Sequence, residues 1–267
     1  MTQASKIAPM ADEVEFHPPS IGDFFPEALL FEGTPFEFTR INLVQVIATV
    51  LLVVFMLLGT RNMKVIPGRF QQIAELGFSF VREQVAYQVI GEREGKRFVP
   101  LLSVLFFGIL FFNIMGVIPG LNIQGTSVIG VPLLLAVVAY IAFIYAGIRK
   151  HGFGRFMKNS LVPGGVPGYL IPVISVIEFI STFIFRPVSL TLRLLLNMMV
   201  GHLMLVLFFA ATHFFLLSFN WLTVLSPGSL ALGFAFTLFE IFVAFLQAYV
   251  FTILTAVYIQ LAVADEH

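Results

Sequence analysis

Cysteine is absent from this chain of 267 residues, and charged residues make up only 11% of it. The absence of cysteine excludes disulfides and thiolate nucleophiles, and most zinc sites with them. The 15 basic and 15 acidic residues cancel, so no net charge favours nucleic acid as a partner. The share of charged residues is far below the roughly 25% that is usual in soluble domains, which indicates a membrane protein. No pattern in the sequence predicts a cofactor or a metal site.

Apolar residues are abundant instead: 58% of the chain is hydrophobic, with 32 phenylalanines and a mean hydropathy of +0.96. Five runs are long enough to cross a bilayer as helices, which takes about 18 to 20 apolar residues. These runs are Ile41 to Gly59, Val99 to Gly120, Ser127 to Gly147, Gly168 to Phe219 and Trp221 to Ala264. The alternating segments of a membrane barrel are not seen. The sequence predicts an all-α integral membrane protein with about five membrane-embedded helices.

Basic residues are unevenly distributed between these runs, and this predicts a topology. Seven lie in the loop at 60–98 and four in the loop at 149–167, whereas the other two connections have none. By the positive-inside rule the two basic loops are cytoplasmic. The acidic N-terminal segment 1–40 then lies outside the cell, residues 41–267 form one polytopic membrane domain, and the C-terminus is cytoplasmic.

The first cytoplasmic loop contains a further helical pattern. In PGRFQQIAELGFSFVREQV, apolar residues recur at helical spacing, with a proline near the start where a helix tolerates one. The residues of this face are Phe70, Ile73, Leu76, Phe80 and Val81. The pattern predicts an amphipathic helix that lies on the cytoplasmic surface of the membrane.

The last two apolar runs are too long for simple membrane crossings. The 52 residues from Gly168 to Phe219 would form a helix of about 78 Å, against a hydrocarbon core of about 30 Å. Each run is therefore either a pair of upright helices or one long helix that tilts steeply and bends. Pro187 is the expected bend site in the second case. The distribution of charge does not decide between the two.

Polar residues inside these two runs are candidates for a site, because a charge in a bilayer costs from about 3 to more than 10 kcal/mol. They are Glu178, Arg186, Arg193, Asn197, His202, His213, Glu240 and Gln247. At about 100° per residue, Arg186, Arg193 and Asn197 share one stripe of a straight helix. His202 stands about 180° from Arg193, so we expect it on the opposite face. Arg193 has long apolar stretches on both sides, which makes snorkelling to an interface difficult.

Most of the other candidates also have a purely structural interpretation. Arg186 could snorkel to an interface, and Asn197 could hold two helices together. His213 lies close to the outer connection, where a solvated histidine is the ordinary case. His202 and Glu240 are either a buried structural pair or a proton-transfer pair, since histidine titrates near neutral pH and carboxyl groups also exchange protons.

Several motifs together resemble a known family. They are RPVSLTLRLLLNMMVGH at 186–202, FTLFEIFVAFLQAYVFTILTAVYI at 236–259, PGRFQQIAEL at 67–76 and FNIMGVIPG at 112–120. On these motifs the chain is similar to subunit a of the bacterial F-type rotary ATP synthase, the stator half of its proton channel. The resemblance covers most of the chain from residue 36 onward, and the first motif is highly specific.

The resemblance implies roles for particular residues. Arg193 matches the essential arginine of the family, which faces the carboxylates of the rotating c-ring, and Asn197 matches a polar residue beside it. His202 and Glu240 match two positions of the proton path at which histidine and glutamate exchange places between members. Gln247, on the same stripe as Glu240, matches a glutamine near the arginine.

Two features match the family less closely. Glu178 is a looser match because its distance to Pro187 varies among members; with His202 and Glu240 we expect it to line the half-channel open to the outside. The chain reads LRLLLNM at 192–198, where LRLFGNM is common, which alters local packing but keeps the arginine. The family also implies that the last two runs are single, steeply tilted helices that wrap against the c-ring.

These observations predict a non-catalytic proton-channel subunit of a rotary synthase, multi-pass in a bacterial plasma (inner) membrane. Its expected partners are the c-ring, the b subunits of the peripheral stalk, lipids and protons. Sodium coupling stays open, because ion choice in this family depends mainly on the c subunits. Two alternatives are a secondary transporter that binds an anion at Arg193, which no internal repeat supports, and a passive scaffold, which Arg193 disfavours.

Overall fold

A computed structural model describes residues 28–30, 37–60, 68–118, 123–161, 169–217 and 221–264, together with Gly22 and Leu121. Most of the acidic N-terminal segment lies outside these residues. So do the start of the first basic loop at 61–67 and the predicted turn VPGGVPG at 162–168. The assignment of 1–40 and 41–267 as separate regions stays a prediction.

The chain is almost entirely helical in the described residues, as predicted. Five helices are long and apolar enough to span a membrane: Arg40–Gly59, Val99–Val117, Gly130–His151, Ile171–Leu217 and Trp221–Val263. The elements in order are β1 (Ala28–Leu30), β2 (Phe38–Thr39), α1 (Arg40–Thr60), α2 (Arg69–Phe80), η2 (Val81–Ile90), α3 (Glu92–Gly95), α4 (Val99–Ile114), η3 (Met115–Val117), α5 (Gly130–His151), α6 (Phe153–Leu161), α7 (Ile171–Ile180), η4 (Ser181–Phe185), α8 (Arg186–Leu217), η5 (Trp221–Leu225) and α9 (Ser226–Val263). The small antiparallel pair β1–β2 was not predicted.

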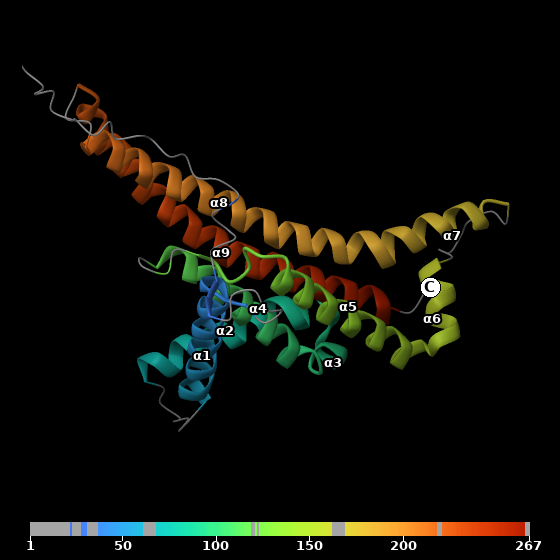
Figure 1. The fold of residues 1–267 in the computed structure, drawn as a ribbon. Helices are drawn as coiled ribbons and strands as arrows, with labels where there is room; N and C mark the ends of the chain where they lie inside the picture. Colours follow the sequence, from blue (N-terminus) through green and yellow to red (C-terminus); the bar gives the residue numbers. More distant parts are fainter. Residues whose placement is uncertain are drawn as a thin grey trace, which may run out of the picture.

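Each of the two long runs is one continuous helix rather than a pair. At 1.5 Å per residue, the 47 residues of α7–η4–α8 span about 70 Å, more than twice the thickness of the hydrocarbon core. A helix of that length fits a bilayer only if it is strongly tilted. Figure 1 shows α8 and α9 side by side in gentle arcs, with α1 standing across them.

Pro187 lies inside this helix without interrupting it. A proline inside a helix has no N–H to donate, and its ring displaces the carbonyl four residues earlier. The wide π-helical turn η4 (Ser181–Phe185) lies at this point and accommodates the ring. On the other side, the Thr191 hydroxyl donates to the Pro187 carbonyl at 2.9 Å. The residue at which the sequence predicts a bend therefore follows a π turn closely, and the bend itself stays a prediction.

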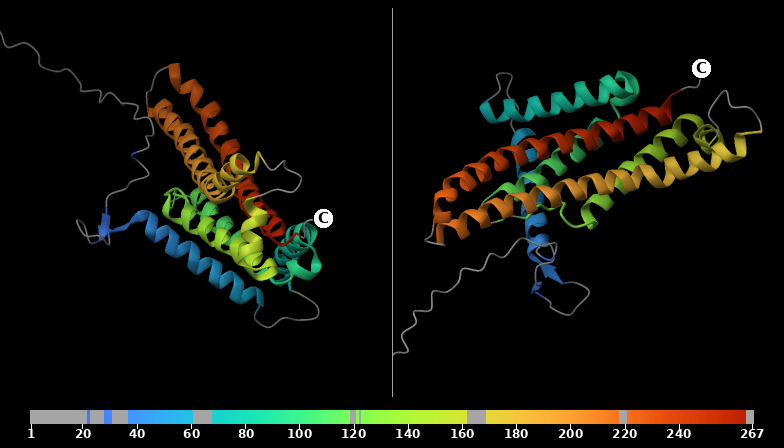
Figure 2. Two further views of the ribbon diagram at one scale, coloured as in Figure 1. Left: turned by 90° about the vertical axis from the view of Figure 1, so that its right-hand side faces the viewer. Right: turned by 90° about the horizontal axis from the view of Figure 1, so that it is seen from above.

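The core lies where the second half of α9 packs against α4, α5 and α8 (Figure 2). Small residues dominate the buried faces of α5 and α9, which lets these backbones approach closely. They include Ala136, Ala139, Ala146, Gly147, Ala244, Ala248 and Ala256. Large apolar side chains fill the remaining space, among them Leu102, Ile109, Leu194, Met198, Phe251 and Ile259. This packing leaves the outer face of α8 without cover from the residues that the structure describes.

The predicted amphipathic helix of the first basic loop is present as α2 and continues as the π-helical segment η2. Its second half is anchored in the core through the fully buried Val81 and Val85. Its first half leaves Phe70, Ile73 and Leu76 exposed on the face that the sequence pattern marks as apolar. This division fits a helix that is held to the bundle at one end and lies on lipid at the other.

Candidate functional site

Arg193 lies near the centre of the continuous helix Ile171–Leu217, on the face that points away from the core. Arg193 and Asn197 are exposed, whereas Leu194 and Met198 on the other side of the same turns are buried. Within the residues that the structure describes, no acidic side chain forms an ion pair with Arg193. The charge is therefore exposed on the surface of the described part of the chain.

A hydrogen bond joins the arginine stripe to α9. The Asn197 Nδ2 donates to the Gln247 Oε1 at 2.9 Å, between the two long helices. Gln247 is buried, and its Nε2 has no hydrogen-bond partner among the described residues. The structure thus brings together two residues that the sequence placed near the arginine.

Glu240 is buried between α9, α8 and the connection that leads from α4 to α5. The Gln124 Nε2 donates to the Glu240 Oε1 at 2.5 Å. A Cβ placed on Gly201 would be 3.3 Å from the same oxygen, so the carboxyl group packs against the α8 backbone beside His202. The other oxygen, Oε2, has no hydrogen-bond partner in the described part of the chain. One carboxyl oxygen is therefore fixed, and the other can exchange a proton.

His202 is buried, on the opposite side of α8 from the exposed Arg193 and Asn197. This is the arrangement that the 180° separation predicts. His213 is exposed near the end of α8, as expected for a histidine close to the outer connection.

A polar cluster at the α4–α5 connection was missed in the sequence. The Thr126 hydroxyl donates to the Asn113 Oδ1 at 2.6 Å, and the Gln45 Nε2 donates to the Gly125 carbonyl at 2.9 Å. Asn113, Gln124 and Thr126 are almost completely buried, where polar groups persist only with partners. The available signal was an asparagine inside an apolar run, followed by several polar residues in an uncharged connection.

A cleft of about 350 Å³ runs between α8 and α9 from Glu240 to the exposed face. Glu240 lies at its inner side and Asn197 on the face that carries Arg193. Its other lining residues are Leu196, Met198, Val200, Gly201, Phe236, Phe239, Val243 and Leu246. The buried Glu240 and the exposed Asn197 thus line the same cleft, and Arg193 lies one turn before Asn197.

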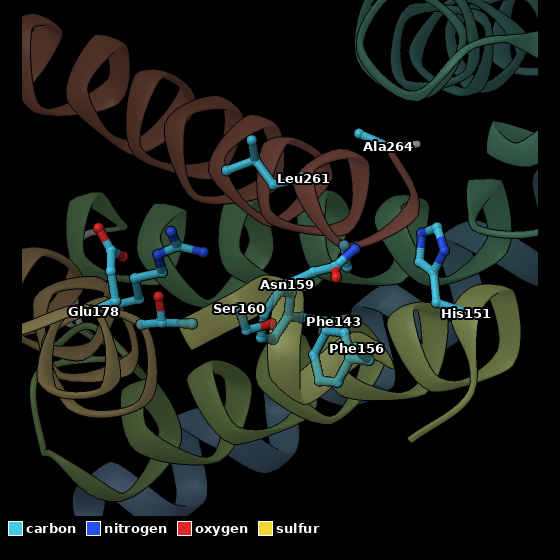
Figure 3. Close-up of a pocket in the computed structure, with 11 residues that line it drawn as sticks. Phe143, His151, Phe156, Asn159, Ser160, Glu178, Leu261 and Ala264 are labelled. Atoms are coloured by element: carbon cyan, nitrogen blue, oxygen red, sulfur yellow. The ribbon is translucent and has the colours of Figure 1, made fainter. Parts of the chain in front are cut away.

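Glu178 does not join His202 and Glu240, contrary to our expectation. It lies in a separate cavity of about 220 Å³ at the opposite end of the bundle, with His151, Asn159 and Ser160 (Figure 3). The physical reason is the continuity of the helix. Glu178 and His202 are 24 residues apart in one helical run, which places them about 36 Å apart along its axis.

Arg186 also lines this second cavity rather than extending the stripe of Arg193. Its guanidinium lies over the rings of Tyr258 and Phe143, with 5.2 Å and 6.0 Å between the guanidinium carbon and the ring centroids. Cation–π contacts of this kind hold an arginine against aromatic faces inside a bundle. The Cα of Arg186 lies at the helical spacing that places it on the stripe of Arg193, but its long side chain extends to these two rings instead.

The described residues contain no group of three or more His, Asp or Glu side chains that could hold a metal ion. The site consists of a buried carboxyl group, a buried histidine, side-chain amides and an exposed guanidinium. Groups of these kinds can exchange protons or stabilise a charge by electrostatic attraction.

Comparison with known proteins gives consistent matches over nearly the whole chain. A sequence model described as ATP synthase A chain matches residues 42–260. ATP synthase subunit a from Rhodococcus erythropolis is 47% identical over 255 residues, which cover 95% of this chain and 93% of that protein. Subunit a from Pseudarthrobacter chlorophenolicus is 37% identical over 264 residues, or 97% and 98% of the two chains. Subunit a from Streptomyces lividans is 34% identical over 258 residues, or 96% and 91%.

Proposed function

Because the chain belongs to the ATP synthase A chain family, as the non-catalytic membrane subunit a of a bacterial F-type ATP synthase, we propose that it conducts protons past a ring of c subunits. In this proposal two half-channels lead to the exposed face of α8, and the movement of protons between them obliges the ring to turn. The b subunits of the peripheral stalk would hold the chain still in the inner membrane.

The exposed position of Arg193 is the observation that supports this proposal most. A charge at the centre of a bilayer costs at least about 3 kcal/mol, and no acidic side chain among the described residues compensates it. A carboxylate on another chain would remove that cost. In our proposal this carboxylate belongs to a c subunit. It is protonated and neutral while it faces lipid, and it loses its proton beside the arginine.

The outer half-channel, as we propose it, begins at the polar connection between α4 and α5. Protons would pass Asn113 and Thr126 to the Glu240 carboxyl and the His202 imidazole, and then through the α8–α9 cleft to the ring. The uncharged connection faces outside under the positive-inside rule. Arg40, which follows the acidic N-terminal segment, donates to the Leu121 carbonyl of this connection at 2.9 Å. Both features favour an outside location for this end of the bundle.

For the inner half-channel we propose the cavity of Glu178, Arg186 and His151. It lies at the end of the bundle where the basic loops begin and where α9 ends, which we assign to the cytoplasm together with the C-terminus. Arg193 would separate the two paths because a guanidinium does not deprotonate and cannot relay a proton. Each proton that crosses 100 mV releases about 2.3 kcal/mol, which would drive rotation.

Sodium coupling and transport of an anion are the alternatives to a proton path. We favour protons because the buried groups around Glu240 are an amide, a histidine and glycine backbone, which exchange or position protons. A secondary transporter would be expected to show inverted repeats or paired broken helices, whereas α8 and α9 are continuous.

ATP-driven acidification of inverted vesicles tests the choice of ion. We expect full acidification, followed by the fluorescence of a pH-sensitive dye, in buffers that contain potassium but no sodium. Addition of sodium should neither raise the rate nor be followed by uptake of radioactive sodium into the vesicles. Uptake of radioactive sodium that an uncoupler does not abolish, without acidification of the vesicles, would instead support the sodium-coupled alternative.

Replacement of Glu178 by glutamine tests the inner half-channel. We expect proton flux through membranes stripped of the catalytic sector to fall several-fold, because glutamine keeps the size of the side chain but cannot exchange a proton. Glu178→Asp should retain much of the flux. Glu83→Gln is the matched control, since Glu83 is exposed and, among the described residues, forms an ion pair with its exposed neighbour Arg82 at 2.9 Å. Equal flux in Glu178→Gln and Glu83→Gln would contradict this assignment.

A further inference from the structure

A third cavity, of about 600 Å³, lies at the basic end of the bundle and takes no part in the proposed proton path. It is bounded by α3, the C-terminal turns of α5 and the end of α9. Three of its lining residues are cationic, namely Arg97, Arg149 and Lys150, and Glu94 is the one carboxylate among the residues that line it. Three positive charges and one negative charge leave a net charge of +2 in the cavity.

Glu94 is shared between two of these cations. Its carboxylate lies 3.2 Å from the Arg97 Nη1 and 4.0 Å from the Lys150 Nζ. Arg149 is held differently: its Nη1 donates to the Tyr145 hydroxyl at 2.6 Å, and its guanidinium lies 5.7 Å from the centre of that ring. The two arginines and the lysine are thus held around one opening, where their positive charges can attract an anion.

An apolar stripe on the outer face of α5 leads to this opening. Leu134, Val137, Ile141 and Tyr145 are exposed and follow one another at intervals of three and four residues, which places them on one face of the helix. Arg149 continues the same face one turn later. A helix face of this composition is in contact with acyl chains when the protein is in a bilayer, and its last turn lies at the level of the headgroups.

We propose that this cavity binds the phosphate of an anionic phospholipid headgroup, with an acyl chain of the same lipid along the α5 stripe. Arg149 and Arg97 would donate charge-assisted hydrogen bonds to the phosphate oxygens, and Lys150 would add a point charge. Basic pockets between membrane helices at the headgroup level recognise anionic lipids through this chemistry. The site is distinct from the path through Arg193, because none of its lining residues lines the other two cavities.

Lipid binding to the intact, detergent-purified synthase tests the proposal. After delipidation, phosphatidylglycerol is titrated back and the number of retained lipids per complex is measured by native mass spectrometry, with phosphatidylcholine as the uncharged comparison. Arg149→Gln should weaken phosphatidylglycerol binding about fivefold, as expected for the loss of one basic residue at a membrane surface. The matched control is Arg155→Gln, which removes the same charge from an exposed position outside the cavity. Equal weakening by both variants would overturn the proposal.

Replacement of Glu94 predicts a change in the opposite direction. Glu94→Gln removes the negative charge from the cavity and releases Arg97 and Lys150 from their shared partner, so phosphatidylglycerol should bind about fivefold more tightly. Glu92→Gln, an exposed residue of α3 outside the cavity, should leave binding unchanged. A gain in both variants would show that only the overall surface charge matters, and a gain in neither would show that Glu94 does not oppose the lipid. Either result would overturn the site.

Inorganic phosphate distinguishes a lipid from a free anion. If the acyl chain contributes through the α5 stripe, millimolar phosphate should leave the bound phosphatidylglycerol in place. Complete displacement by phosphate at that concentration would overturn the lipid assignment and indicate a site for free phosphate. Equal retention of phosphatidylcholine and phosphatidylglycerol would also overturn it, because the net charge of +2 would then have no role.

Discussion

Replacement of Arg193 by alanine is expected to abolish ATP-driven proton pumping in inverted vesicles while the synthase complex still assembles. The side chain is exposed and makes no ion pair among the described residues, so its removal leaves the packing of α8 on α9 unchanged. What is lost is the charge that favours the ionised c-subunit carboxylate and the barrier between the half-channels. Protons would then cross without turning the ring.

Two measurements separate this expectation from a folding defect. Pumping is followed by dye quenching, and passive proton flux is followed in vesicles stripped of the catalytic sector; we expect loss of the first and persistence of the second. Arg193→Lys should also fail to pump, because a lysine in an apolar environment releases its proton and can relay it. Arg155→Ala, an exposed arginine of α6, should pump normally. Normal pumping by Arg193→Ala would contradict the proposed mechanism.

The helical fold and the exposed arginine face could be predicted from the sequence because both follow from local periodicity. Apolar runs of sufficient length become membrane helices, and residues at positions 193 and 197 share a face of any helix. The burial of Leu194 and Met198 on the other side agrees with this spacing. The prediction needed no knowledge of the neighbouring helices.

The location of Glu178 and the partner of Glu240 could not be predicted in the same way. The position of Glu178 depends on whether residues 171–217 form one helix or two, and charge patterns did not decide that. The partner of Glu240 is Gln124, 116 residues earlier in the chain. A single sequence does not indicate such a contact, because the contact depends on how α4, α5 and α9 pack together in the bundle.

The second prediction concerns Gln124, which we expect to hold the Glu240 carboxyl group in position. Gln124→Leu has nearly the same shape but donates no hydrogen bond, so the Glu240 Oε1 loses the donor that fixes it. A hydrogen bond to a charged group is worth about 1.5 to 3 kcal/mol, which corresponds to a reduction of proton flux of about tenfold or more. Flux is measured in stripped vesicles at equal amounts of assembled complex.

Gly116 offers an independent way to displace the same side chain. A Cβ on Gly116 would overlap Gln124, lying only 2.8 Å from its Cδ, so Gly116→Ala should push the amide away from Glu240 and lower the flux. Gly108, two turns earlier in α4, has open space where a Cβ would lie. Gly108→Ala is therefore the matched control and should conduct normally.

A double variant decides whether Gln124 acts through Glu240 or only stabilises the bundle. In a Glu240→Gln background the carboxyl group is already absent, so Gln124→Leu should cause no further loss of flux. A purely structural role would produce the same proportional loss in both backgrounds and would lower the amount of assembled complex. Because the Oε2 of Glu240 has no partner among the described residues, the carboxyl group held by Gln124 keeps one oxygen for the proton, and the two variants together test that division of roles.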